Sequence, residues 1–362
     1  MADDAGEPDA ALIALDWGTT TFRAWLLDSA GTVLDRVRSD DGVLTVSERA
    51  GTAAARAVAF ADVFGRQCRP WLAGHPGVPV LCAGMAGSNH GWAEAGYLDV
   101  PAELGELAGL LTVVPAGESV VHIVPGLRAT GADPDVMRGE EVQLVGALSG
   151  QDGPATVLLP GTHSKWVRLD GARVTGFTTA MTGELYGLLL RDSILARLAT
   201  GAPGPEVTEA FLRGLETESA LGDERGLPAL LFTARTHVLA GLLEPGHVAD
   251  YVSGLLIGTE VRHGLRTTPD GVVALCGPPS TTDRYRAALE RCGASVRVVP
   301  EGAAVRGLWR VAADAGLVPA RSAPVTSPPA APSPAAPSAA VPPATRAPSP
   351  TPAPPATEEP SP

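Results

Sequence analysis

The amino-acid sequence predicts an α/β protein of two domains with a functional cleft between them. Three observations predict this class: apolar strand-like runs alternate with helix-like segments, one strand–turn–strand unit occurs twice, and 362 residues of which 45% are hydrophobic can build two cores. The expected domains cover residues 11–145 and 146–318. We expect disorder in residues 1–10 and in the Pro-, Ala- and Ser-rich tail 319–362, which lacks the apolar residues that a core needs.

Composition argues against several classes of partner. The formal net charge of −13 argues against nucleic acid, because a phosphate backbone is bound by clustered positive charge. No apolar run reaches the roughly 18 residues of a membrane span, and the acidic N-terminus does not resemble a secretory signal. The four cysteines are far apart, which favours buried thiols over a metal site or a disulfide. We therefore expect a cytoplasmic protein with small-molecule partners, and leave open whether it forms a homodimer.

The ordered chain begins with three short strands. Residues 11–15 form an apolar run that ends at Asp16 and a turn rich in glycine and threonine. A second run, residues 22–27, ends at an Asp-Ser-Ala-Gly turn, and a third begins near Thr32. Short runs separated by such turns indicate an antiparallel meander. A helical segment over residues 47–74, with Ser47 as its N-cap, and a buried strand over residues 78–84 are expected to follow.

The same unit recurs in the second half of the chain. From residue 155 to residue 183 the order is again apolar strand, Gly-Thr turn, strand, Asp-Gly turn and strand. Gly161 therefore corresponds to Gly18, and a threonine follows each of them. The remaining segments are expected to be helical or to alternate strand, turn, helix and strand: residues 183–198, 208–216, 227–243 and 248–265 for the helices, and residues 271–299 for the alternating piece.

Two Gly-Thr turns that face each other can bind the phosphates of a nucleoside triphosphate. A glycine at the tip lets backbone N–H groups approach a phosphate without interference from a Cβ atom, and threonine hydroxyls add donors. Asp16, just before the first turn, is the expected Mg²⁺ ligand. The residues expected to bind ATP and its phosphates are Gly18, Thr19, Thr20, Thr21, Arg23, Gly161, Thr162, His163 and Ser164, with Gly277 and Pro278 at the adenine and ribose.

These motifs resemble a known family. The stretch DWGTTTFRAW resembles the first phosphate motif of the actin-like ATPase and sugar-kinase superfamily. Together with CAGMAGSNHGW, VMRGEEVQLVGAL, LPGTHSKWV, MTGELY and GLLIGTE, it is similar to the 2-dehydro-3-deoxygalactonokinase family over residues 10–315. The resemblance implies two ribonuclease-H-like domains, ATP and Mg²⁺ as cofactors, and phosphorylation of 2-dehydro-3-deoxy-D-galactonate at its 6-hydroxyl. The alternatives are a kinase for another sugar or sugar acid, such as the gluconate epimer, and a non-catalytic sugar-binding protein or activator ATPase of the same superfamily.

The resemblance also assigns the catalytic carboxylate. Glycerol-kinase-type enzymes carry their aspartate base in a Gly-Asp-x-Gln element, and this sequence has Glu140 after Gly139 at the matching place. Glu140 is therefore the expected base, with Glu141 and Asp135 as alternatives that the sequence leaves open. A carboxylate at Glu140 is equally explained by a helix N-terminus, where the helix dipole favours negative charge.

Lys165 is the chain's only lysine, since arginine occupies every other basic position. It follows the second Gly-Thr turn, where a compact ammonium could contact a phosphate or a substrate carboxylate, although it could also be a surface lysine. Together with Asp16 and Glu140 it completes the expected catalytic set. The residues expected to bind the sugar acid are Trp17 at the mouth of the cleft, Ser88 and Asn89 in a polar loop, Arg138 and Glu141.

Overall fold

The computed structural model describes residues 9–148, 155–200, 204, 206–268 and 270–319, all within one compact unit. The disorder expected at the two ends falls on residues 1–8 and 320–362, which lie outside the described residues. Ala10, which was assigned to the disordered N-terminus, instead begins the first strand. None of the helices in the described ranges is long and apolar enough to cross a membrane.

The first half of the chain forms a six-stranded mixed sheet with the order β3-β2-β1-β4-β8-β7. The first three strands are an antiparallel meander, and β4 and β8 run parallel to β1. The predicted meander is therefore confirmed. The strands are β1 (Ala10–Trp17), β2 (Phe22–Asp28), β3 (Val33–Ser39), β4 (Val80–Gly84), β7 (Thr112–Ala116) and β8 (Ser119–Ile123).

A second sheet, with the order β15-β14-β11-β12-β13-β6, repeats this topology, and all of its strands except β6 come from the second half of the chain. Again three antiparallel strands are followed by two parallel ones, so that β13-β12-β11-β14-β15 corresponds to β3-β2-β1-β4-β8. Both sheets thus have the strand order of a ribonuclease-H-like fold. The strands are β11 (Thr156–Leu159), β12 (Ser164–Asp170), β13 (Arg173–Ala180), β14 (Val272–Leu275), β15 (Ser295–Val298) and β6 (Ala102–Glu103). A third, small sheet contains β5 (Tyr97–Val100), β9 (Gly126–Ala129) and β10 (Asp135–Met137).

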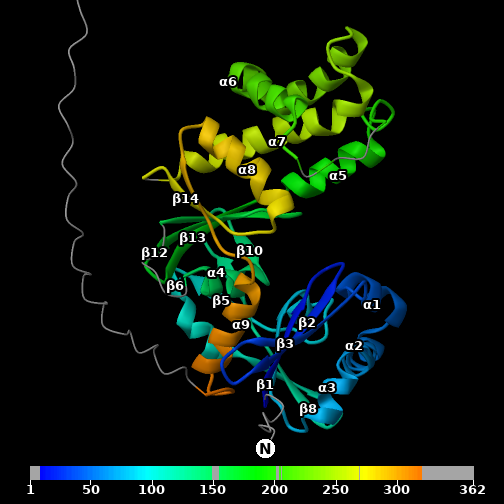
Figure 1. The fold of residues 1–362 in the computed structure, drawn as a ribbon, viewed down its shortest axis with the longest axis vertical. Helices are drawn as coiled ribbons and strands as arrows, with labels where there is room; N and C mark the ends of the chain where they lie inside the picture. The colour runs from blue at the N-terminus through cyan, green and yellow to red at the C-terminus, as the bar shows by residue number, and fades with distance from the viewer. Residues whose placement is uncertain (1–8, 149–154, 201–203, 205, 269, 320–362) are drawn as a thin grey trace, which may run out of the picture. The chain divides into compact units, whose positions relative to one another are not determined.

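Helices cover the sheets as Figure 1 shows, with α1 to α3 beside the first sheet and α5 to α8 gathered beyond the second. The expected helix over residues 47–74 is three helices, and Ser47 lies inside the first of them. The N-cap of the second is Thr52, whose side chain accepts a hydrogen bond from the Ala55 N–H. The helices of the first half are α1 (Val43–Ala50), α2 (Ala53–Gln67), α3 (Arg69–Gly74) and α4 (Glu140–Leu148), with short 3₁₀ turns η1 (Met85–Gly87) and η2 (Leu104–Leu110).

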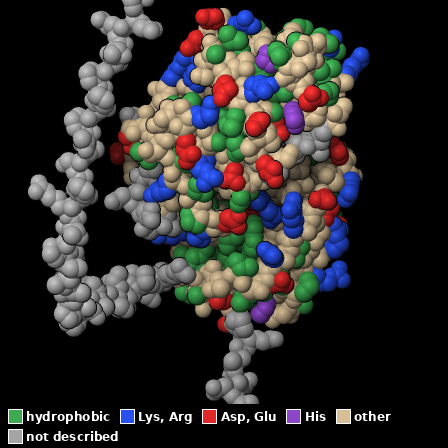
Figure 2. Space-filling model, turned by 45° about the horizontal axis from the view of Figure 1, so that its top comes forward, with side chains coloured by type: hydrophobic (Ala, Val, Ile, Leu, Met, Phe, Trp, Pro, Cys, Tyr) green, Lys and Arg blue, Asp and Glu red, His purple; other side chains and the backbone are tan. Residues whose placement is uncertain are grey.

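The longest helix contains a kink. In α6 (Glu209–Leu239) Gly226 has a φ of 68°, so the helix is kinked there, and this kink separates the two helical segments that the sequence predicts. The other helices of the second half are α5 (Thr182–Asp192), α7 (Val248–Leu265), α8 (Pro279–Arg291) and α9 (Ala303–Asp314), with the 3₁₀ turn η3 (Pro245–His247). On the face drawn in Figure 2, acidic and basic side chains are intermingled, and no patch of one sign dominates.

Helices α4 and α9 cross with their backbones in contact. A Cβ atom on Gly307 would lie 1.7 Å from the carbonyl oxygen of Val142, and one on Gly146 would lie 1.9 Å from that of Ala303. Helix α9 also contacts β1 and β4 of the first sheet, although it lies near the end of the chain. Because α9 contributes to both halves, the domain division near residue 145 stays a prediction.

The close crossing generates a stability prediction. Gly307→Ala should destabilise the protein by about 1–3 kcal/mol, because the added methyl group would overlap backbone that cannot move aside. The matched control is Gly65→Ala in α2, where an added Cβ meets nothing within 4 Å. That control should stabilise by up to about 1 kcal/mol, since alanine is the better helix former. Urea unfolding of the three proteins measures both changes. Equal stability of Gly307→Ala and the parent would contradict the described crossing.

Candidate active site

The two Gly-Thr turns meet at one cavity of about 430 Å³. Its walls come from both halves of the chain, from the ends of β1 and β4, the start of α4 and the turn between β11 and β12. The residues predicted for the site that line it are Asp16, Gly18, Thr19, Arg23, Ser88, Arg138, Glu140, Gly161, Thr162, His163 and Lys165. The structure therefore brings together most of the predicted phosphate-binding residues and all three predicted catalytic residues.

Asp16 lies at the end of β1, directly opposite Arg23 on β2. The Asp16 carboxylate is 5% exposed and accepts a hydrogen bond of 2.5 Å from Arg23. Burial raises the pKa of Asp16, and the Arg23 charge acts in the opposite direction. A buried carboxylate at the edge of a polar cavity needs a positive partner, which a cation bound at this position would add to Arg23.

The first Gly-Thr turn is held from behind by the start of α1. The N–H groups of Val43 and Leu44 donate to the carbonyls of Gly18 and Thr19, at 3.0 and 3.1 Å. Gly42 lies so close to the turn that a Cβ there would be 2.2 Å from the carbonyl carbon of Thr20. Thr20 and Thr21 do not line the cavity, so only part of the predicted turn faces it. No local pattern in the sequence indicates that Gly42 is needed for this close contact.

Lys165 and Glu140 face each other across the cavity. Lys165 is 4% exposed, and its Nζ lies 3.7 Å from Oε1 of Glu140. The other oxygen, Oε2, accepts a hydrogen bond of 3.0 Å from the Arg138 N–H, which fixes the carboxylate at the first residue of α4. Burial raises the pKa of Glu140, the charge of Lys165 lowers it, and the nearby Asp16 raises it further. Lys165 is therefore no surface residue but the buried member of an ion pair whose other member, Glu140, is half-buried.

The two other carboxylates that the sequence left open as the base do not line the cavity. Glu141 is completely buried, and its Oε2 accepts a hydrogen bond of 2.6 Å from the Gly139 N–H. Burial and the adjacent charge of Glu140 raise the pKa of Glu141 to about 8. Asp135 accepts two hydrogen bonds of 2.7 Å from the N–H and hydroxyl of Thr179, so it joins β10 to β13. The prediction that Glu141 contacts the sugar acid is wrong, because its side chain lies beneath the cavity wall.

Two further predicted site residues point into the core. Trp17 is fully buried, and its ring makes edge-to-face contacts with Phe22, Phe60 and Trp92. Its Nε1–H donates to the Asp41 carbonyl at 2.7 Å. Trp17 follows Asp16 in a strand, where successive side chains point to opposite faces, so it cannot share the cavity with Asp16. The prediction that Trp17 lies at the mouth of the cleft is wrong.

Ser164 is excluded from the cavity for the same reason. It precedes Lys165 in β12 and faces the other side of the sheet, where its hydroxyl lies 3.0 Å from the Tyr285 hydroxyl. Tyr285 in turn donates to Glu260 at 2.6 Å, and the Trp166 Nε1–H donates to the same carboxylate at 2.9 Å. The prediction that Ser164 binds phosphate is wrong, since its hydroxyl belongs to a buried network.

The polar loop after β4 contributes one of its two predicted residues. Ser88 lines the cavity, and its Oγ is buried without a hydrogen-bond partner among the described residues. Asn89 is exposed and does not line the cavity, so its contact with the substrate stays a prediction.

Arg138 lies partly at the cavity but turns its guanidinium toward another loop. Its Nη2 donates to the carbonyls of Ala95 and Gly96 at 2.7 and 3.2 Å, and the group lies 4.4 Å from the centre of the Tyr97 ring. Nε and Nη1 are buried without a partner among the residues described here. Two nitrogens of Arg138, with three N–H donors between them, therefore remain for a ligand.

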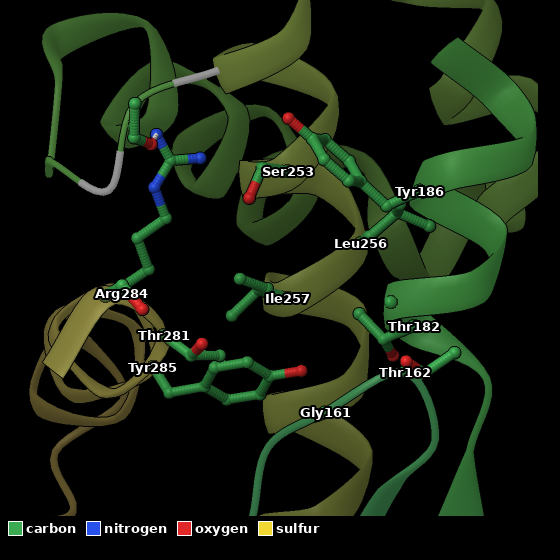
Figure 3. A pocket seen from close by; sticks show the side chains of 13 residues that line it. Gly161, Thr162, Thr182, Tyr186, Ser253, Leu256, Ile257, Thr281, Arg284 and Tyr285 are labelled. Atoms are coloured by element: carbon green, nitrogen blue, oxygen red, sulfur yellow. Dashed lines mark hydrogen bonds between the residues drawn. The ribbon is translucent and has the colours of Figure 1, made fainter. Parts of the chain in front are cut away.

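A second, larger cavity of about 560 Å³ adjoins the first and shares Gly161 and Thr162 with it. Figure 3 shows its walls, with Tyr186 and Thr182 of α5 on one side, Arg284 and Thr281 of α8 on the other, and Ile257 of α7 behind. Gly277 and Pro278 do not line it. They line a third hollow of about 510 Å³, next to the N-terminus of α9. The strand–turn–helix element predicted around them is present, but Ser280 and Thr281 reach the larger cavity instead.

Comparisons with known proteins identify the family of this chain. A family model described as 2-keto-3-deoxy-galactonokinase matches residues 16–311. A probable 2-dehydro-3-deoxygalactonokinase of Rhizobium meliloti is 39% identical over 302 residues, covering 81% of this chain and 93% of the relative. The 2-dehydro-3-deoxygalactonokinase of Escherichia coli is 37% identical over 294 residues, covering 80% and 93%.

A solved structure is similar over the same region. The crystal structure of a candidate 2-dehydro-3-deoxygalactonokinase from Sinorhizobium meliloti matches with a TM-score of 0.73 and 36% identity, covering 83% of this chain and 98% of that one. The family match spans both sheets and every residue of the cavity that the two turns share. The chain therefore belongs to the 2-keto-3-deoxy-galactonokinase family.

Proposed function

We propose that this chain transfers the γ-phosphoryl group of ATP to the 6-hydroxyl of 2-dehydro-3-deoxy-D-galactonate, giving 2-dehydro-3-deoxy-6-phosphogalactonate and ADP. The observation that supports the proposal is the cavity in which the two Gly-Thr turns meet the ion pair of Lys165 and Glu140. The family membership supports the substrate. The proposal places the reaction in the cytoplasm, where ATP is available.

The two adjoining cavities suit the two ends of ATP. The larger has apolar walls from Leu256 and Ile257 and polar groups at its rim, which fits an adenine and a ribose. Gly161 and Thr162 line both cavities, so phosphates that extend from the larger one would cross this turn and end near Lys165. In this arrangement the nucleoside lies against α8 at Ser280 and Thr281, whereas Gly277 and Pro278 line a different hollow and do not contact it.

The chemistry of the transfer needs a proton acceptor and a positive charge. The 6-hydroxyl oxygen attacks the γ-phosphorus, the bond from that phosphorus to the β–γ bridging oxygen breaks, and ADP leaves. Glu140 accepts the hydroxyl proton, for which a raised pKa suits it. Lys165 neutralises charge on the transferring group, and its partner Glu140 keeps it in place until then.

The residues present also fit a magnesium ion bound together with ATP. In the described part of the chain no group of three or more His, Cys, Asp or Glu side chains could hold a metal by itself. Mg²⁺, however, commonly takes one or two carboxylates and completes its shell with substrate phosphates and water. Asp16 is the carboxylate that would hold it, since burial leaves Asp16 in need of positive charge. When bound, the ion would neutralise the phosphates of ATP.

Polar groups without partners support a hydroxylated acid as the substrate. Among the described residues, the hydroxyl of Ser88 and two nitrogens of Arg138 have no hydrogen-bond partner, and an unpaired buried polar group costs about 1–3 kcal/mol. A substrate that shifts the Arg138 side chain slightly could satisfy both with a hydroxyl and a carboxylate. A neutral polyol has no group that would use the guanidinium charge as well.

The function is tested by measuring ADP release with a panel of acceptors at fixed ATP. The panel contains 2-dehydro-3-deoxy-D-galactonate, its gluconate epimer, D-galactonate, glucose and glycerol. The proposal expects the highest kcat/KM with the galactonate-derived 2-keto acid and a product phosphorylated at oxygen 6. A higher kcat/KM with the epimer would mean that the epimer is the substrate, while the reaction would still be a sugar-acid phosphorylation. Release of ADP that no acceptor stimulates would contradict the kinase itself.

Replacing the base gives the first functional prediction. Glu140→Gln should lower kcat roughly 10²–10⁴-fold while the KM values change little, because the proton acceptor is lost and the shape is kept. The matched control is Glu141→Gln, an adjacent buried carboxylate that does not line the cavity, and it should keep most of its activity. A larger loss of kcat in Glu141→Gln than in Glu140→Gln would contradict the assignment of Glu140 as the base.

The raised pKa of Glu140 also predicts the pH profile. The base must be ionised to accept a proton, so kcat/KM should fall as the pH decreases through the pKa of Glu140. Because burial raises that pKa, the fall should occur at a higher pH than the usual range of glutamate, near 4.3. Rates measured from pH 4 to pH 9 test this. A profile that stays flat down to about pH 4 would exclude Glu140 as the base.

The single lysine can be tested by its closest substitute. Lys165→Arg should lower kcat at least about tenfold, because the planar guanidinium is larger than the ammonium and Lys165 is almost completely buried. Lys165→Met should lower kcat more, since it leaves Glu140 without its positive partner. Steady-state kinetics of both variants measure the effect. An arginine variant as active as the parent would mean that lysine has no special role at this position.

A further inference from the structure

The start of α5 packs directly against the back of the second Gly-Thr turn. A Cβ on Gly183 would lie 2.4 Å from the carbonyl oxygen of Gly161 and 2.8 Å from the α-carbon of Thr162, so the helix and the turn touch backbone to backbone. The next residue, Glu184, donates its N–H to the Thr162 carbonyl at 3.0 Å. The helix therefore determines where the turn lies.

The Glu184 side chain makes a second contact with the same turn. Its Oε2 lies 2.5 Å from Nε2 of His163, and both side chains are partly exposed. His163 lines the cavity that contains Lys165, whereas Glu184 lines neither that cavity nor the larger one beside it. The carboxylate thus holds the imidazole from the side away from the cavity.

This contact decides which nitrogen of His163 remains for a ligand. An ionised carboxylate only accepts hydrogen bonds, so Nε2 must carry a proton and donate it to Glu184. Nδ1 is then left for a ligand in the cavity. Nδ1 can donate to an anionic oxygen only when it also carries a proton, that is, when the ring is an imidazolium.

We propose that Glu184 is a positioning residue for nucleotide binding, which holds His163 so that Nδ1 meets a phosphate oxygen of ATP or ADP. The inference rests on the proposed function, because it takes the turn to be a phosphate site. Glu184 carries negative charge and would repel phosphate if it acted directly. Its effect on nucleotide affinity must therefore pass through His163.

The test measures the Kd of ADP and of a non-hydrolysable ATP analogue by calorimetry, with Mg²⁺ present and no sugar acid. Glu184→Ala should weaken nucleotide binding roughly tenfold, which is typical of losing one charge-assisted hydrogen bond. Glu184→Gln keeps an acceptor oxygen for Nε2 and should stay within about threefold of the parent. His163→Ala should lose about as much as Glu184→Ala. The control is Glu216→Gln, whose carboxylate pairs with Arg291 on the surface and should leave the Kd unchanged.

The double variant separates positioning from independent effects. If Glu184 acts through His163, His163→Ala/Glu184→Ala should bind nucleotide no worse than either single variant, within about twofold. A loss equal to the product of the two single losses would overturn the inference. So would a Kd unchanged in Glu184→Ala, even if thermal unfolding showed a lower Tm. If the parent itself bound no nucleotide, the proposed function would fail rather than the role of Glu184.

Discussion

The ion pair between Lys165 and Glu140 is the interaction on which the site depends. Lys165 is buried, and a buried charge is costly unless an opposite charge such as the half-buried Glu140 pairs with it. Lys165 comes from the second sheet and Glu140 from the first residue of α4, so the pair holds the two halves of the chain to a common cavity. The same charges that stabilise each other in the free protein can be redirected to a phosphoryl group and a hydroxyl proton.

The duplicated unit extends beyond the strands to the helix that follows each meander. Gly42, just before α1, lies against Thr20 of the first turn, and Gly183, in the first turn of α5, lies against Gly161 of the second. In both copies a glycine lets the start of a helix touch the turn, and backbone hydrogen bonds join the two. Both Gly-Thr turns are therefore supported by helices, as a site that holds a ligand in fixed geometry requires.

Much of the fold could be predicted because its signals are local. The apolar runs and Gly-Thr turns predicted both meanders, and the repeated order of strands predicted the duplication. The small sheet of β5, β9 and β10 and the contact of α9 with the first sheet depend on pairing between distant residues, which no local pattern shows. Serine is a common N-cap, so the sequence predicts that the helix begins at Ser47. The helix in fact begins at Val43, with Gly42 as its N-cap.

The site predictions are wrong where every residue of a motif is expected to face the ligand. Trp17 and Ser164 belong to the phosphate motifs, but each is adjacent to a cavity residue in a strand, so its side chain points into the core. Applying this alternation to the strands would have excluded both. Glu184 could not have been found in this way, since its role depends on where α5 returns to the turn. Glu140 is predicted by its place in the motif. The complete burial of Glu141 below the cavity then distinguishes the two glutamates.

The most direct test of the account is a structure of the protein with a non-hydrolysable ATP analogue, Mg²⁺ and 2-dehydro-3-deoxy-D-galactonate. The account predicts that the γ-phosphate lies between the turns at Gly18 and Gly161, with Lys165 beside it. The 6-hydroxyl should lie about 2.6–3.2 Å from a carboxylate oxygen of Glu140. A nucleotide bound away from the Gly161 turn, or a 6-hydroxyl that faces another carboxylate, would contradict it.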